Sequence, residues 1–313
     1  MKKVIEKAVV IMEKKTNVGG QAVIEGVMMR GSKGLATAVR LPNGSIEVKK
    51  ENSTSYTKKN KFLGLPLIRG FVSLIESLVV GIKSLEYSAS FFEEEEEEES
   101  KFDKWFDKTF KDKGDSVLMG ISLVLSLTFS ILLFFILPTT LASIMKRYVT
   151  DNAVALNIME GIIRVLIFLS YIILIGKMKD IYRLYQYHGA EHKTIFCYEN
   201  GIELTSENAQ KFGRLHPRCG TNFMFLVMVI SIIIFSFTGW ESIGQRIISR
   251  ILLLPLVSGI TYEVIRWLGK SDSIISKVIA WPGLLLQKIT TKEPDEKMLE
   301  VAIASLKAAE GLE

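Results

Sequence analysis

Cysteine and histidine are scarce in this chain, and the few that are present lie close together in the sequence. The 313 residues include only two cysteines, Cys197 and Cys219, and three histidines, His188, His192 and His216. All five lie in or beside one polar stretch that is flanked by long apolar runs. Because imidazole and thiol groups bind borderline metals and imidazoles exchange protons near neutral pH, we expect the site of any chemistry to lie here.

Other absences exclude broad classes of function. The first fifteen residues contain too short an apolar stretch for a signal peptide. The net charge is +5, but no basic patch carries interleaved aromatic residues. We therefore expect membrane lipids as partners and no nucleic acid. There is no internal repeat, and the apolar runs are few for a transporter, which disfavours a transport function.

Long apolar runs are abundant. Hydrophobic residues make up 48% of the chain, and the excess is concentrated in four runs. The first, residues 116–137, carries no charge and is long enough to cross a bilayer, which needs about 20 apolar residues. The others are residues 155–175, 223–237 and 251–268. The sequence therefore predicts a mainly α-helical membrane protein with about four transmembrane helices.

Lysine and arginine are unevenly distributed between the connecting segments. Residues 101–115 contain five of them and residues 177–222 contain seven, whereas each of the two remaining loops contains two. The excess of positive charge on one side predicts that both termini and the His/Cys loop 177–222 are cytoplasmic, in a multi-pass protein of the inner (plasma) membrane. Thiols stay reduced in that compartment, so we expect no disulfide.

The first sixty residues predict a small cytoplasmic module that contains a β-hairpin. Asn43 and Gly44 lie between two strand-like segments and readily adopt the backbone angles of a tight turn. Residues 61–92 are apolar nearly all round, which predicts an interfacial or re-entrant helix. Such a wide apolar face must be covered by lipid, a partner helix or another subunit.

Three further segments complete the predicted organisation. Residues 93–115 begin with seven consecutive glutamates and predict a charged, solvated linker. Residues 116–268 form the four-helix membrane region. Residues 269–313 predict an interfacial segment, interrupted at residues 281–283 (Trp-Pro-Gly), and a soluble C-terminal helix.

The histidine stretch contains the spacing H-x-x-E-H, formed by His188, Glu191 and His192. On a helix these positions share one face, so two imidazoles could bind a metal beside a carboxylate. The inverted zincin motif has the same spacing. His216 and Cys219 offer a further imidazole and a thiol. Three histidines and one cysteine would complete a tetrahedral shell for zinc or another divalent metal.

Two alternatives stay open at this point. The same side chains could form a hydrogen-bonded polar core without a metal, in which cysteine acts as a small apolar residue. If a metal binds, four protein ligands would make the site structural. Three ligands and a water, with Glu191 as general base, would make it catalytic.

Two pairs of opposite charges lie inside the predicted membrane helices. Glu160 and Arg164 are four residues apart, and Glu263 and Arg266 are three apart. Charges at membrane depth are costly and usually face a bundle interior. We expect two intrahelical ion pairs; alternatively, Glu263 and Arg266 support the histidine site from beneath.

Five short motifs resemble one known family: GGQAVIEGVMMRG (19–31), LPLIRG (65–70), HGAEHKTI (188–195), HPRCGTNF (216–223) and TTKEP (290–294). In order and over nearly the whole chain, they resemble the YqhQ-like family of bacterial and plastid membrane proteins, a domain of unknown function (DUF1385). The resemblance implies a multi-pass membrane protein. The family is often described as predicted metal-dependent enzymes on the basis of the same His and Cys motifs, so the resemblance implies a metal-dependent activity as one possible function. The resemblance implies no substrate.

Two functions follow from these patterns. The favoured one is a homo-oligomeric scaffold or chaperone-like factor for client membrane proteins, because residues 61–92 are too apolar to be left in water. The alternative is a membrane-embedded zinc enzyme, hydrolase-like, that uses the His/Glu/Cys cluster. The sequence leaves open whether the protein is an enzyme.

Overall fold

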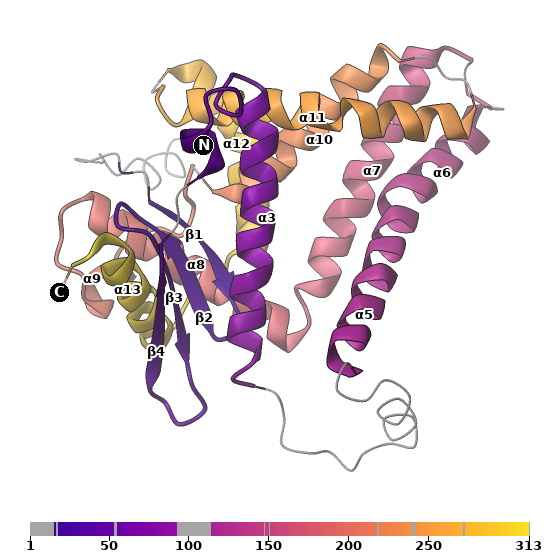
Figure 1. The fold of residues 1–313 in the computed structure, drawn as a ribbon. Coiled ribbons are helices and arrows are strands. Elements are labelled where there is room, and N and C mark those ends of the chain that lie inside the picture. Colours follow the sequence, from indigo (N-terminus) through magenta and orange to yellow (C-terminus); the bar gives the residue numbers. More distant parts are fainter. Residues whose placement is uncertain are drawn as a thin grey trace. The chain divides into compact units, whose positions relative to one another are not determined.

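Figure 1 shows the computed structural model of the chain, which describes residues 16, 18–52, 55–92, 114–146, 148–149, 151–217, 219–238, 242–271 and 273–312. The seven glutamates of the predicted linker lie outside these residues. The chain divides into two compact units. The first comprises Met1–Phe91, Ile172–Ser231 and Ile248–Glu313, and the second comprises Phe92–Tyr171 and Ile232–Ile247.

The first unit contains a four-stranded antiparallel sheet in the order β1 (Gly19–Val23), β2 (Gly26–Arg30), β3 (Leu35–Arg40) and β4 (Ile46–Glu51). Each strand pairs with the next along the chain, so the sheet is a simple meander. The predicted hairpin is confirmed: its turn joins β3 to β4, and Gly44 has a positive φ of 86°. The N-terminal region therefore contains more strand than the hairpin alone.

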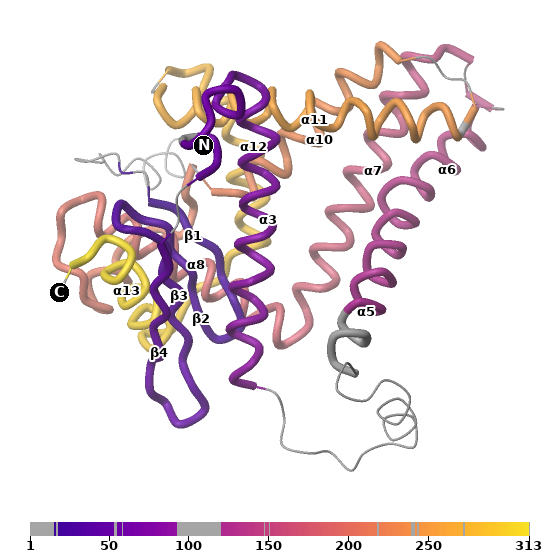
Figure 2. The backbone as a smooth tube through the Cα atoms, viewed as in Figure 1, coloured from indigo at the N-terminus to yellow at the C-terminus, as the bar shows by residue number. Residues whose placement is uncertain are grey.

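One face of the sheet packs against α8 (Lys179–Glu199) and α13 (Glu296–Glu310) in a common hydrophobic core. In Figure 2 the C-terminal helix α13 lies beside the strands from the start of the chain. Cys197 is fully buried in this core, where it acts as a small apolar residue. The side chain of Asp295 caps the start of α13, and Gly311, at a φ of 70°, ends it.

The helix α3 (Ile68–Ala89), preceded by the short α2 (Tyr56–Lys59), contributes to a second cluster with the sheet. Val80 and Leu85 of α3 pack against buried side chains of β1, β2 and β3. A row of apolar side chains on α3 stays about half exposed: Ile75, Leu78, Val79 and Ile82. The apolar face expected for this segment is therefore present.

Three helices of the described chain are long and apolar enough to span a membrane: Gly120–Lys146, Ala153–Ile175 and Gly244–Leu268. The remaining predicted run, residues 223–237, forms α10 (Gly220–Ser236), which is a shorter apolar helix of 17 residues. The prediction of a mainly helical protein with apolar helices and an N-terminal β-containing region is confirmed.

The first of these spans contains a π-helical turn, and the third continues through Pro255. The first span begins in α5 (Gly114–Ile131), passes through a π-helical turn at Leu132–Ile136 and ends in α6 (Leu137–Lys146). The second span is α7 (Ala153–Ile175), and the third lies in α11 (Ile243–Leu268). Beyond them, α12 (Ile274–Thr290) runs without a break through Pro282, where the sequence predicts an interruption. A proline removes one backbone hydrogen bond, and the packing of this helix tolerates that loss.

The two charge pairs that the sequence predicts inside membrane helices differ in the structure. Glu160 and Arg164 form the expected intrahelical pair, with Nη2 2.8 Å from Oε1. Glu263 instead receives two hydrogen bonds from Arg69 at the start of α3. This pair joins two helices of the first unit, where the sequence predicts a pair between Glu263 and Arg266. The reason is that a bidentate guanidinium contact is stronger than a contact between two neighbours on one helix.

Candidate metal centre

The helix α8 carries His188, Glu191 and His192 on one face, as their spacing predicts. The Nδ1 atom of His188 lies 2.9 Å from the carbonyl oxygen of Thr290, and that of His192 lies 2.6 Å from the carbonyl oxygen of Arg214. Since a carbonyl oxygen only accepts, both Nδ1 atoms carry the proton and both Nε2 atoms offer a lone pair. Metal-ligating histidines are oriented by the same kind of contact.

The Cys219 thiol completes a group of three ligand atoms. Its Sγ lies 3.1 Å from Nε2 of His188, and the ligand atoms of His188, His192 and Cys219 all lie within 4.8 Å of one another. Around a tetrahedral zinc ion, with bonds of about 2.0–2.3 Å, neighbouring ligand atoms are about 3.3–3.8 Å apart. These three side chains could therefore hold one metal ion and leave a fourth position open.

The protonation states fit this ligand set. Burial lowers the pKa of His192, which favours the neutral imidazole that metals bind. Burial alone would raise the pKa of the Cys219 thiol, but the polar groups around it lower it overall, among them Thr221, which donates two hydrogen bonds to Sγ. A neutral imidazole and a thiolate are the forms that coordinate a metal.

Two buried polar atoms near the centre lack a hydrogen-bond partner among the described residues. They are Nε2 of His192 and Oε2 of Glu191. An unsatisfied buried polar atom costs free energy, so such atoms call for an explanation. A metal ion bound to Nε2 would satisfy the first. The fit between the ion and the residues present is therefore supported by geometry, protonation and burial together.

Glu191 is held against the start of the sheet. Its carboxyl group accepts a hydrogen bond from the backbone N–H of Gly20 in β1. Burial raises the pKa of Glu191 to about 8, despite the opposing influence of His188. A carboxyl group with such a pKa can exchange a proton near neutral pH, as a general acid or base must.

Gly20 allows this close approach, which leads to a prediction. A Cβ at Gly20 would lie 2.5 Å from the carbonyl oxygen of Met28 and 3.1 Å from Cδ of Glu191. We expect Gly20→Ala to lower the free energy of unfolding by about 1–3 kcal/mol, because the backbone must shift. Gly19→Ala is the matched control, since a Cβ there meets nothing within 4 Å. Thermal unfolding of both variants in detergent tests this, and equal midpoints would contradict it.

His216 lies beside the three-ligand group instead of within it. Its ring centroid is 5.6 Å from that of His192, and its Nε2 is 3.5 Å from Oε2 of Glu199. The backbone N–H of His216 donates to Oε1 of Gln287 at 2.7 Å. The geometry therefore groups three of the four predicted ligands and gives the third histidine a carboxylate neighbour.

Sequence reasoning missed several residues that shape the site. Glu199 lies seven residues after His192 on α8, and this spacing on one helix face is a signal that could have identified it. Gln287 binds both the N–H and the carbonyl of His216 through its side chain. Thr290 and Arg214 act through their backbone carbonyls, which no side-chain pattern reveals.

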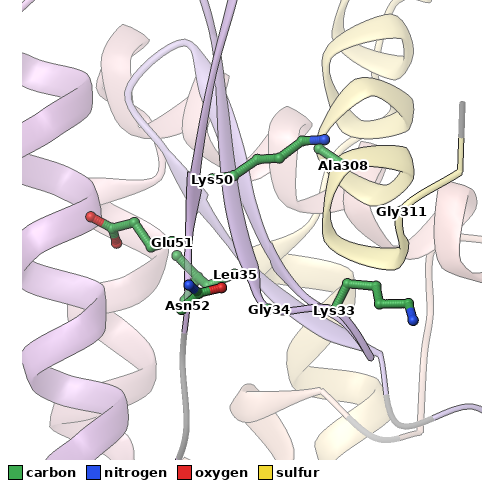
Figure 3. Close-up of a pocket in the computed structure, with 8 residues that line it drawn as sticks. All are labelled: Lys33, Gly34, Leu35, Lys50, Glu51, Asn52, Ala308 and Gly311. Atoms are coloured by element: carbon green, nitrogen blue, oxygen red, sulfur yellow. The ribbon is translucent and has the colours of Figure 1, made fainter.

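A cavity of about 350 Å³ lies elsewhere in the first unit, between the sheet and the end of α13 (Figure 3). Its lining residues are Lys33, Gly34, Leu35, Lys50, Glu51, Asn52, Ala308 and Gly311. None of the histidines or cysteines lines it. In Figure 3 Lys50 extends towards Ala308 whereas Glu51 points away. This cavity is therefore separate from the candidate metal centre.

Comparison with known proteins places this arrangement in a family. Residues 65–311, which include every residue of the candidate metal centre except those of β1, match a family described as "Protein of unknown function (DUF1385)". The chain is also 35% identical over 290 residues to a protein of Bacillus subtilis (strain 168) named "Uncharacterized protein YqhQ". The aligned residues make up 92% of this chain and 90% of that protein. No solved structure shows a significant match. The chain therefore belongs to the DUF1385 family.

Proposed function

We propose that this chain is a membrane-bound, metal-dependent hydrolase. The observation that supports it best is the pair of imidazoles on α8, His188 and His192, which are fixed by backbone carbonyls and present Nε2 towards the Cys219 thiol. A buried carboxyl group, Glu191, lies next to them. Three protein ligands with an open fourth position are typical of catalytic metal sites, whereas structural sites have four.

The proposed reaction needs a bound ion and a proton-transferring side chain. A bound divalent cation, of which zinc is the one we propose, would supply Lewis acidity that polarises a substrate carbonyl oxygen. Such a positive charge also favours the ionised form of Glu191. Oε2 of Glu191 would then take a proton from the attacking water and return it to the leaving group. His188 and His192 hold their Nδ1 protons on backbone carbonyls throughout, which keeps the rings in place.

The excess of lysine and arginine in residues 177–222 supports a cytoplasmic position for this centre, in an inner (plasma) membrane protein with both termini on the same side. This orientation belongs to the proposal. It is tested with a variant in which the two native cysteines are removed (Cys197→Ala and Cys219→Ser) and one cysteine is introduced by Lys211→Cys, at an exposed position between α8 and α10. The introduced cysteine is labelled in intact and in permeabilised cells. We expect labelling only after permeabilisation.

The enzymatic proposal is tested with the full chain purified into lipid nanodiscs. We expect hydrolysis of esters or amides that is lost with a chelator and restored by zinc or another divalent cation. A protein that contains no metal and takes up none, assayed after growth in zinc-supplemented medium, would contradict the proposal.

A second candidate function rests on a different observation. The exposed apolar row on α3 (Ile75, Leu78, Val79 and Ile82) suits burial against another copy of the chain or a client membrane protein. This supports a homo-oligomeric scaffold or chaperone-like role. Mass measurement in native-like lipid tests it: we expect an oligomer, and a strict monomer would contradict self-association.

A further inference from the structure

The helix α12 has an apolar face that the described residues leave uncovered. Ile274 is 81% exposed, Ile275 and Val278 are each 65% exposed, and Trp281 is 51% exposed. These residues lie at positions i, i+1, i+4 and i+7, which share one side of a helix. A contiguous apolar patch of this kind marks a surface that contacts a membrane or a partner.

The opposite face of the same helix forms part of the wall of the metal centre. The side chain of Gln287 is fully buried and holds the backbone of His216. One turn later, the carbonyl oxygen of Thr290 accepts the Nδ1 proton of His188. A single helix thus connects the exposed apolar surface to a ligand of the proposed metal.

The start of α10 indicates the depth of the centre relative to a bilayer. Cys219 directly precedes α10, and the first strongly apolar residue of that helix is Phe223. At about 1.5 Å per residue, the thiol lies about 6 Å along the helix axis from Phe223. The metal centre is therefore expected at the level of the lipid headgroups, where the hydrocarbon region begins.

The charges beside the apolar face favour lipid over a protein partner. Lys277 and Lys288 of α12 are exposed, and Trp281 is of the residue type that prefers the membrane–water boundary. Lysine side chains next to an inserted apolar face contact lipid phosphates. The apolar row, the tryptophan and the two lysines together match the pattern of a helix lying in the membrane surface.

We propose, resting on the hydrolase function above, that the substrate is a membrane lipid carrying an ester or amide bond in its headgroup region, which reaches the centre along α12. The water oxygen bonds to the acyl carbon, the bond from that carbon to oxygen or nitrogen breaks, and the leaving atom takes the proton that Glu191 received. A single metal beside one carboxyl group suits acyl transfer, whereas phosphoryl displacement commonly uses two metals.

The membrane contact of α12 is tested without any assay of activity. A variant that keeps Trp281 as its single tryptophan, with Trp105, Trp240 and Trp267 changed to phenylalanine, is placed in vesicles of brominated phosphatidylcholine and phosphatidylglycerol. We expect its fluorescence to fall at least about twofold, as for an interfacial tryptophan. The matched control has Trp281→Phe and Glu300→Trp, on the exposed side of α13. Equal quenching of the two proteins would overturn the inference.

The substrate class is tested by the ratio of two rates, one on lipid esters or amides in vesicles and one on a short water-soluble ester. We expect Val278→Glu to lower this ratio about tenfold, because a buried carboxylate opposes insertion of the helix, and Val278→Leu to leave it unchanged. An unchanged ratio in Val278→Glu would overturn the lipid proposal. Absence of hydrolysis of every substrate would instead refute the hydrolase function, and the quenching result would still decide the membrane contact.

Discussion

Replacing Glu191 with glutamine is expected to lower the rate of hydrolysis by about 10²–10⁴-fold, the usual contribution of a general acid or base. Glutamine keeps the size of the side chain and the hydrogen bond from Gly20, but it cannot accept the proton of water. Because Glu191 is outside the group of three ligand atoms, we expect the metal content of the variant to stay the same. Rates and metal content are measured on the same nanodisc preparations.

Glu207→Gln is the control for this prediction. The Glu207 side chain is 86% exposed, and its one ion pair among the described residues is a long one with Lys211, so its loss should leave both the rate and the metal content unchanged. A Glu191→Gln protein that retains full activity would remove Glu191 from the mechanism. If the metal were lost as well, Glu191 would act as a ligand and the assignment of roles would be wrong.

Replacing Glu160 with alanine is expected to lower the free energy of unfolding by about 3–5 kcal/mol, the typical cost of removing one partner from a buried ion pair. Glu160 is 1% exposed within α7 and accepts hydrogen bonds from Thr139 and Arg164, both at 2.8 Å. Its second carboxylate oxygen lies 3.7 Å from Nη1 of Arg246. Alanine would leave the buried guanidinium group of Arg246 and the partly buried one of Arg164 without this carboxylate.

Unfolding of the Glu160→Ala protein is measured in mixed detergent micelles. Glu207→Ala serves as its control, because exposed ion pairs contribute at most about 1 kcal/mol. The double change Glu160→Leu with Arg164→Leu should restore part of the loss, since it removes one buried charge together with its partner. If Glu160→Ala unfolded at the same point as Glu207→Ala, the pair would contribute nothing to the stability of the second unit.

The general form of the fold was readable from the sequence because its signals are strong. Uncharged runs such as residues 116–137 predict helices by length and composition, and Asn43-Gly44 predicts a tight turn. The pairing of β1 with β2 was harder to see, because glycine-rich strands carry a weak alternation pattern. The partner of Glu263 could not be read at all, since Arg69 is 194 residues away in the chain.

The grouping of the His188, His192 and Cys219 side chains could be predicted from the sequence, but the residues around them could not. The spacing of His188, Glu191 and His192 on one helix face, and the convergence of Cys219 with the two histidines, agree with the structure. The sequence predicts His216 as a fourth ligand, but it does not show that Glu199 faces this histidine, which lies beside the group of three ligand atoms in the structure.

The geometry of the site favours an enzyme over a scaffold. The sequence favours a scaffold because of the apolar segment 61–92, the soluble terminal segments that could form subunit contacts, and a membrane region that is small for a transporter. The structure adds two carbonyl-fixed imidazoles, a thiol with a lowered pKa and a buried carboxyl group. These features have a specific chemical use in an enzyme, which is the reason for placing the hydrolase first.

Every role proposed for this centre depends on the binding of a metal ion by His188, His192 and Cys219. Elemental analysis of the full chain, purified in mild detergent from zinc-supplemented cells, tests it most directly. We predict about one zinc ion or other divalent ion per chain, and near-complete loss in a folded Cys219→Ser protein. An equal metal content in both proteins, or none in either, would contradict the claim.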